Sequence, residues 1–214
     1  MPAMPENPNR SYSIEFLLAE YNQISEETRR LRAEGLNRLN FFITLTSSVL
    51  GGVVLLSQLN ITSVVVVEWI ALGTLLFLAV VGWNAFRFTV SRDINTDFNI
   101  RATARIRRFF VEHDPQVGPY LTWHYHDEPT GWIVGNTSNL RGTTQLILAL
   151  LLALTVGLVT YLLVGLIISA VIVGLVGFAL ALALLIRYAR HRFEIARKIA
   201  EESVRFSRAA AYEE

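Results

Sequence analysis

The longest uncharged stretch of the chain constrains its fold more than any other feature. It covers residues 143–186 and contains no Asp, Glu, Lys or Arg. A single helix of these 44 residues would extend about 66 Å, roughly twice the thickness of the hydrocarbon core of a bilayer. The stretch therefore predicts two membrane-spanning helices joined by a turn at 161–165, midway between the flanking charges Arg141 and Arg187.

Two earlier runs have the length and composition of further spans. Residues 41–59 carry no charge and residues 64–86 carry only Glu68, while about 20 apolar residues are enough to cross a bilayer. Over the whole chain only 17% of residues are charged, below the roughly 25% of soluble domains. We expect an all-α integral membrane protein with four transmembrane helices arranged as two hairpins.

The distribution of cations predicts the orientation. All 19 Lys and Arg residues lie before Phe41, between Arg87 and Arg141, or after Ile186, and cytoplasmic segments are the ones enriched in these residues. Both termini are therefore expected in the cytoplasm and the four spans in the plasma (inner) membrane. The expected segments are a cytoplasmic helix 1–40, a hairpin 41–86, a cytoplasmic helix plus aromatic loop 87–142, a hairpin 143–186, and a cytoplasmic helix 187–214.

Apolar residues recur at three- and four-residue steps outside the spans, which is typical of amphipathic helices. They predict helical extensions into the cytoplasm over residues 13–40, from Arg87 to about His113, and from Arg187 to about Ala210. Three prolines and three glycines in 115–135 predict a short irregular or hairpin loop instead. The apolar stripes pack within one subunit, between subunits, or both, and we expect a homo-oligomer.

Within the spans, hydroxyl and carboxyl groups are the candidates for a hydrated path. Thr44 and Ser48 are four residues apart on the first span, and Glu68 lies near the outer end of the second. Polar groups are costly inside a membrane, so their presence there indicates a functional role, and these three residues are the pore-lining candidates. The alternatives are hydroxyls bonded to their own backbone and a Glu68 that reaches interfacial water.

Two basic clusters are expected at the inner leaflet, where anionic lipid headgroups or another anionic ligand would bind them. They are Arg105, Arg107 and Arg108, followed by Arg187, Arg190 and Arg192. Membrane lipids are thus expected partners, and nothing in the sequence predicts a nucleic-acid partner.

His124, His126 and Glu128 alternate, so an extended segment would place them on one face, as weak metal-ligand candidates. The alternative is a set of polar residues on an aromatic loop, and we expect no metal and no cofactor. The chain has no cysteine and no phosphate-binding loop, zinc-helix signature or nucleophile elbow, so we expect no enzyme activity.

Residues 106–115, IRRFFVEHDP, followed by 119–121, PYL, resemble a motif of uncharacterised bacterial four-pass membrane proteins. Glu20 with Tyr21 and the run 29–32, RRLR, are similar to the entry helix of those proteins. A cytoplasmic helix that leads into a short membrane hairpin and out into another helix is also similar to the SLATT class of prokaryotic defence effectors. That resemblance implies membrane perforation triggered by a cytoplasmic sensor, although the second hairpin departs from the SLATT pattern.

Two functions fit these features. The first is an oligomeric membrane effector or channel-like protein that responds to a cytoplasmic signal, with phage defence as the implied setting. The alternative is a non-conducting membrane anchor or regulatory subunit that recruits a cytoplasmic protein partner. The bare outer turns and the long cytoplasmic helices are compatible with both.

Overall fold

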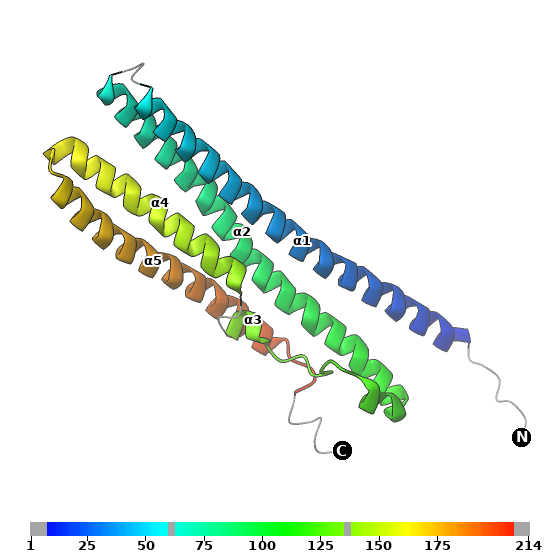
Figure 1. The fold of residues 1–214 in the computed structure, drawn as a ribbon. Helices are drawn as coiled ribbons and strands as arrows, with labels where there is room; N and C mark the ends of the chain where they lie inside the picture. Colours follow the sequence, from blue (N-terminus) through cyan, green and yellow to red (C-terminus); the bar gives the residue numbers. More distant parts are fainter. Residues whose placement is uncertain (1–7, 60–62, 135–137, 208–214) are drawn as a thin grey trace, which may run out of the picture. The chain divides into compact units, whose positions relative to one another are not determined.

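The computed structural model describes residues 8–59, 63–134 and 138–207, and its regular structure there is entirely helical (Figure 1). Four helices are long and apolar enough to cross a membrane, which confirms the all-helical class and the predicted number of such helices. The elements are α1 (Pro8–Gln58), α2 (Val64–His113), the 3₁₀ helix η1 (Pro115–Tyr120), α3 (Gly131–Val134), α4 (Asn139–Val164) and α5 (Ile167–Glu202).

The ends of the helices have local causes. α2 ends at His113 because Pro115 follows, and the Asp114 carboxylate accepts a hydrogen bond from the Gln116 amide to begin η1. α4 ends where predicted: Gly165 adopts the left-handed conformation (φ 73°), and its N–H donates to the carbonyl of Tyr161. The loop after η1 takes the irregular form, with no strand among its described residues.

The C-terminal helix was predicted to reach about Ala210, and this is wrong. α5 ends at Glu202, and the N–H groups of Ser203 and Val204 donate to Ala200 and Glu201 in a closing turn. The next two N–H groups, of Arg205 and Phe206, donate to the Asp127 carboxylate. A buried carboxylate thus takes the donors that would have continued the helix, and Ala210 itself lies outside the described residues.

The chain forms two compact units, each described here on its own. Unit 1 comprises residues 1–33, 93–136 and 195–214, and unit 2 comprises residues 34–92 and 137–194. In unit 1 the apolar stripe of α1 is partly covered: Ile14, Leu17, Tyr21 and Ile24 are half-buried, whereas Leu18 is exposed. Asn99 on α2 donates to the Thr28 hydroxyl on α1 at 3.3 Å, so the two helices also share a polar contact.

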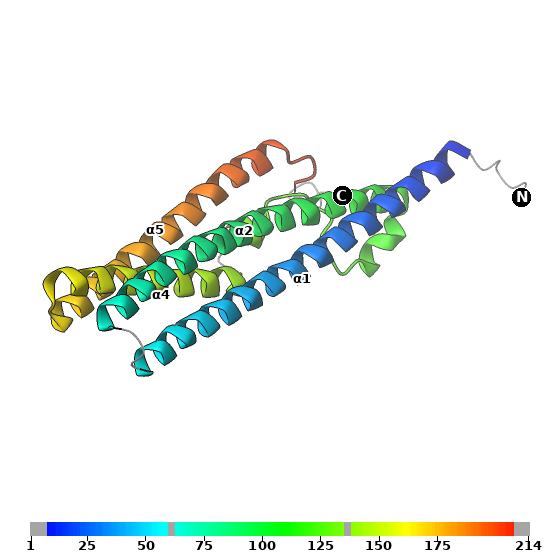
Figure 2. The ribbon, with the colours of Figure 1, turned by 90° about the horizontal axis from the view of Figure 1, so that it is seen from above.

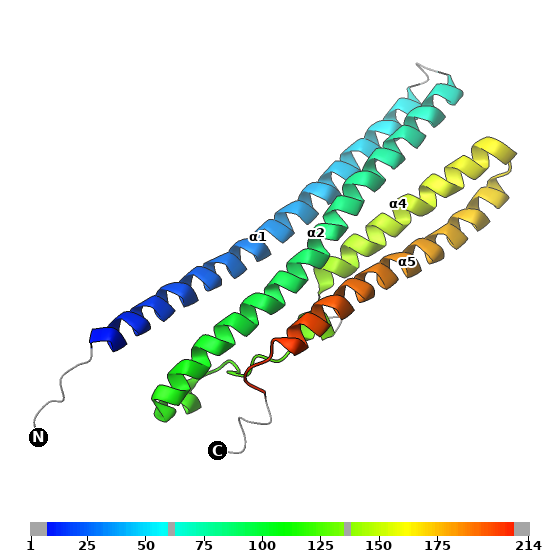
Figure 3. The same cartoon turned by 180° about the vertical axis from the view of Figure 1, so that it is seen from behind.

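Unit 2 contains the apolar parts of the four long helices. Its central cluster is Phe42, Leu75, Leu78 and Leu151, contributed by α1, α2 and α4. Gly82 allows close packing there, because a Cβ at this position would lie 2.7 Å from the Phe42 ring. In this unit α4 and α5 lie side by side in Figures 1 and 3, and Figure 2 shows that they diverge away from the turn that joins them.

Small residues explain how closely α4 and α5 approach. A Cβ on Gly157 would lie 3.2 Å from the Ala170 carbonyl oxygen, and one on Gly174 would lie 3.4 Å from the Ala153 carbonyl oxygen. Small residues at four-residue spacing allow such contacts between helix backbones in lipid. On these two helices the small-residue lines therefore serve packing within one chain.

Candidate functional site

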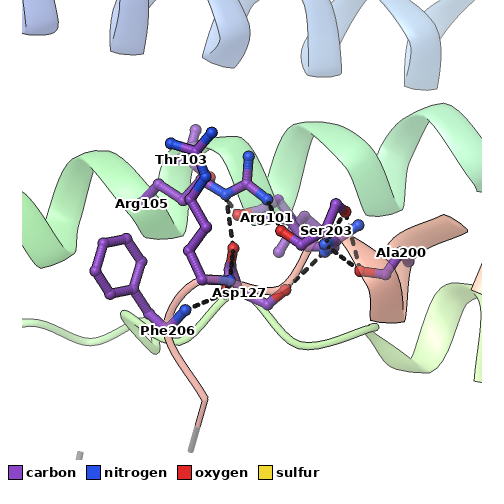
Figure 4. Close-up of polar contacts among 9 residues, drawn as sticks. Arg101, Thr103, Arg105, Asp127, Ala200, Ser203 and Phe206 are labelled. Carbon is purple, nitrogen blue, oxygen red and sulfur yellow. Dashed lines mark hydrogen bonds and ion pairs between the residues drawn. The ribbon is translucent and has the colours of Figure 1, made fainter.

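The most organised polar site of unit 1 centres on Asp127, which is fully buried in the loop between η1 and α3 (Figure 4). Its Oδ2 accepts a hydrogen bond from Arg105 Nε at 2.6 Å. Its Oδ1 accepts from the backbone N–H groups of Phe206 at 2.8 Å and Arg205 at 3.1 Å. In addition, the Asp127 N–H donates to the Phe206 carbonyl at 3.1 Å. Asp127 thus joins α2 to the segment that follows α5.

Arg101 makes a second set of contacts between the same parts of the chain. Its Nε donates to the Asp127 carbonyl at 2.7 Å, and its Nη2 donates to the Ala200 carbonyl at 2.7 Å and to Ser203 Oγ at 2.8 Å. Arg105 Nη2 donates to the Ser203 carbonyl at 2.7 Å. Arg101 and Arg105 reach these groups together because residues four apart lie on one face of a helix. Their charges also suit the partial negative charge at the end of α5.

A further carboxylate fixes the loop three residues downstream. Asp97 Oδ1, on α2 one turn before Arg101, accepts a hydrogen bond from the Thr130 N–H at 2.7 Å. Residues 127–130 are therefore attached to α2 at two points. We call the set of Arg101, Arg105, Asp127 and the segment 203–206 the C-terminal latch.

The two carboxyl groups have opposite pKa shifts. Burial raises the pKa of Asp127, but hydrogen bonds from the Phe206 amide, Arg105 and the Arg205 amide outweigh it, so that its pKa lies below the ordinary value. For Asp97 burial dominates and raises the pKa, with the Thr130 hydrogen bonds and Arg101 opposing it only in part. Asp127 is therefore an ionised partner of the arginines at neutral pH.

This arrangement is suited to holding segments together. The donors and acceptors named above are paired with one another across α2, the loop and the residues after α5. Breaking one side of a buried ion pair is costly, because the remaining charge loses its partner. The attached arrangement is therefore the favoured one, because detaching residues 203–206 would leave the Asp127 carboxylate without their amides and the two arginines without Ser203.

The structure places the pore-lining candidates on two helices of unit 2, α1 and α2. Thr44 and Ser48 lie on an exposed face of α1, and Glu68 is half-buried near the start of α2. Among the described residues, Thr144, Thr155 and Thr160 donate their hydroxyls to carbonyls one turn earlier, and Thr44 and Ser48 make no such bond.

The two arginine clusters differ in how they are used. Arg105 belongs to the latch, Arg107 donates to the Tyr21 hydroxyl at 3.5 Å, and Arg108 pairs with Glu112 at 2.7 Å. The second cluster, on α5, is exposed: Arg187 and Arg190 line a shallow hollow with His191, and Arg192 lies outside it. The second cluster is therefore the freer of the two for an anionic headgroup.

The aromatic loop brings only part of its candidate metal ligands together. The rings of His124 and His126 stack with their centroids 4.9 Å apart. Glu128 lines a separate hollow of about 380 Å³ with Arg197 and Glu201. Within the described part of the chain, no three His, Asp or Glu side chains are placed to share a metal ion.

Arg101 and Asp127 were missed as site residues in the sequence. Arg101 precedes Arg105 by four residues, so the two lie on the same face of a helix. Arg107 and Arg108 do not share that spacing with Arg105, so the helical period could have identified Arg101 as the neighbour of Arg105. Asp127 offered no comparable signal, because its partners Arg205 and Phe206 are almost 80 residues away in the sequence. Only the fold brings these segments together.

Comparison of the chain with protein-family models, with curated proteins and with solved structures finds no match.

Proposed function

We propose that this protein is a homo-oligomeric effector of the inner membrane that permeabilises the bilayer when a cytoplasmic signal acts on unit 1. The four long apolar helices cross the membrane as two hairpins. Both termini and the segment 87–142 lie in the cytoplasm, as the one-sided distribution of Lys and Arg favours. The resemblance to defence effectors makes phage infection the condition in which to look for the signal.

The observation that carries the proposal is the exposed polar line of α1. Thr44, Ser48 and Gly52 are spaced by four residues, and a Cβ added at Gly51 or Gly52 would meet no atom within 4 Å. A face that meets only lipid gains nothing from hydroxyls, whereas small and hydroxyl residues are enriched where helices meet in membranes. In an oligomer, this line lies between subunits and supplies polar groups to a hydrated path.

The latch supplies the second part of the proposal, a response to a cytoplasmic signal. It lies in unit 1, which contains the segments expected in the cytoplasm, and it ties the end of α5 to α2. Both helices continue into the apolar part of the chain. A signal that detaches residues 203–206 would therefore act on two membrane helices at once.

One observation favours the second candidate function, a membrane anchor for a cytoplasmic partner. Large apolar side chains of unit 1 remain exposed in pairs one turn apart, Tyr12 with Phe16 and Ile195 with Ile199. Such pairs are the anchors with which a partner helix or a second copy would pack. An anchor needs these surfaces but needs no polar line on α1.

The test is solute flux through liposomes that contain the purified protein. Asp127→Asn, which weakens the latch, serves as an activated form that needs no natural signal. We expect dye or ion release to be faster with Asp127→Asn than with the wild type. We also expect Thr44→Leu and Ser48→Leu, in the Asp127→Asn background, to reduce it. Thr160→Leu is the matched control, because this hydroxyl is bonded to its own helix.

Three outcomes separate the readings. If flux occurs but Thr44→Leu and Ser48→Leu leave it unchanged, the protein forms a pore, but Thr44 and Ser48 do not line it. Absence of flux in both wild type and Asp127→Asn, together with co-purification of a soluble protein that Phe16→Ser abolishes, would favour the anchor. A mass of one protomer in detergent and again in nanodiscs would contradict the homo-oligomer.

A further inference from the structure

Unit 2 contains an apolar groove of about 760 Å³ between its helices. All four long helices contribute to it, through residues that include Leu50, Leu75, Leu154 and Phe178. Gly157 and Gly174 form part of the lining where α4 and α5 approach each other closely. The lining residues are otherwise apolar, and Tyr161, at one end of the groove, is the residue among them with a polar side-chain group, its hydroxyl.

The length of the groove matches one leaflet of a bilayer. Along α4 its lining runs from Leu150 to Tyr161, and along α5 it runs from Ile167 to Phe178. Each of these twelve-residue stretches of helix rises about 16 Å, roughly half of a 30 Å hydrocarbon core. Tyr161 lies at the end close to the Gly165 turn, where amphipathic aromatic residues meet lipid headgroups.

Its size and lining select among the molecules that could fill it. Water needs two to four polar partners, and this lining does not provide them. A helix of a second copy is about 10 Å wide, so it would cover the groove from outside, and this occupant is one outcome of the test below. An apolar cavity of about 150 Å³ stays dry and binds benzene, and this groove, with about five times that volume and a similarly apolar lining, suits a longer flexible hydrocarbon chain.

We propose that this groove binds one acyl chain of a phospholipid from the leaflet nearest the Gly165 turn, with Tyr161 directed at the headgroup region. The inference rests on the proposed insertion into a membrane and is independent of conduction, because neither Thr44 nor Ser48 lines the groove. The bound chain fills the space between the α1–α2 and α4–α5 pairs and so becomes part of the packing of unit 2.

The test is photo-crosslinking in nanodiscs that contain phosphatidylcholine with a diazirine on its acyl chain. The attachment sites are mapped by mass spectrometry. Leu150 in the groove and Leu76 outside it make a matched pair, because both are leucines and are 53% and 52% exposed. Each extra carbon contact adds little dispersion energy, so we expect a moderate enrichment, about three- to fivefold at Leu150 over Leu76.

Filling the groove should remove the enrichment. Ala71, which is half-buried, lines the groove, and Ala71→Phe or the smaller Ala71→Leu is expected to bring the Leu150 to Leu76 ratio close to one. Gly73→Phe is the control, since a side chain at Gly73 meets open space on the same helix. Cysteine accessibility at the outer turns verifies insertion of each variant independently.

Two results would overturn the proposal. The first is equal labelling of Leu150 and Leu76 in the wild type, which is the result expected if lipid contacts the groove no more than the rest of the protein surface. The second is labelling at Leu150 that falls below that at Leu76, because another protein surface would then cover the groove. An enrichment that survives both Ala71 variants would place the lipid elsewhere and would equally reject this site.

Discussion

Replacing Asp127 by Asn removes the charge of the latch while keeping its shape almost unchanged. In the wild type, Oδ1 accepts from the Phe206 and Arg205 amides and Oδ2 accepts from Arg105 Nε. An asparagine has one oxygen for these donors. If its oxygen remains at the Oδ1 position, its NH₂ group faces Arg105 Nε, and two donors oppose each other.

The magnitude follows from these contacts. A hydrogen bond to a charged group contributes about 1.5–3 kcal/mol net, and the remaining arginine loses its ion-pair partner. The Arg105 side chain is 32% exposed, so water solvates the unpaired guanidinium and reduces the free-energy cost. We therefore expect the attachment of residues 203–206 to weaken by about 2–3 kcal/mol, which corresponds to about 30- to 150-fold in the detached population.

Limited trypsin digestion measures this population. The bond between Arg205 and Phe206 is a tryptic site, and both amides adjoining it are held by Asp127 in the attached state. When opening is fast relative to cleavage, the cleavage rate follows the open fraction. We expect Asp127→Asn to be cut there about 30- to 150-fold faster than the wild type, with the product identified by its mass.

Glu112→Gln is the matched carboxylate control. Glu112 also pairs with an arginine of α2, Arg108, but its side chain is 46% exposed, so the change should alter cleavage by less than about threefold. Equal cleavage of Asp127→Asn and the wild type would refute the latch. Equal acceleration by Glu112→Gln would show that the effect is a general loss of charge.

Further predictions concern pH and packing. The lowered pKa of Asp127 stabilises unit 1 above the ordinary value of 3.8, and this stability is lost as the pH falls below 3.8 through the lowered pKa. Pepsin cleavage beside Phe206, normalised to a site on α1, should therefore rise over that window in the wild type and stay flat in Asp127→Asn. The pH dependence that Asp97 contributes has the opposite sign, because its pKa is raised: unit 1 gains stability as the pH falls through this raised pKa towards 3.8. Asp97→Asn should abolish that gain in the same assay. Gly82→Ala places a Cβ 2.7 Å from the buried Phe42 ring and should destabilise unit 2 by about 1–3 kcal/mol. Its melting temperature in detergent should fall, while that of Gly73→Ala, where the Cβ meets open space, should not.

The long helices were predictable because their signal is local. The absence of charge over residues 143–186 predicts two helices, and Gly165 supplies the left-handed residue that ends the first of them. The end of α2 was similarly visible, since Pro115 cannot continue a helix. In each case the residues that determine the boundary lie next to it.

The latch was not predictable because its partners are far apart in the sequence. The periodicity after Arg187 continues past Glu202, and nothing in residues 203–206 shows that a distant carboxylate takes their amides. The same limit applies to Arg105, which the sequence assigned to headgroups together with Arg107 and Arg108. Ion pairs between separate elements depend on the tertiary fold, whereas helix boundaries depend on neighbouring residues.

The most direct test of the account is the topology of the four helices, because the proposed pore, the cytoplasmic location of the latch and the lipid site all depend on it. The chain has no cysteine, so single cysteines can be introduced without background. Ser63→Cys and Leu166→Cys, at the two short turns, should react with a membrane-impermeant thiol reagent in intact cells. Ser25→Cys and Ser207→Cys should react only after the cells are permeabilised. Labelling of the last two in intact cells, with the first two silent, would invert the topology and contradict the account.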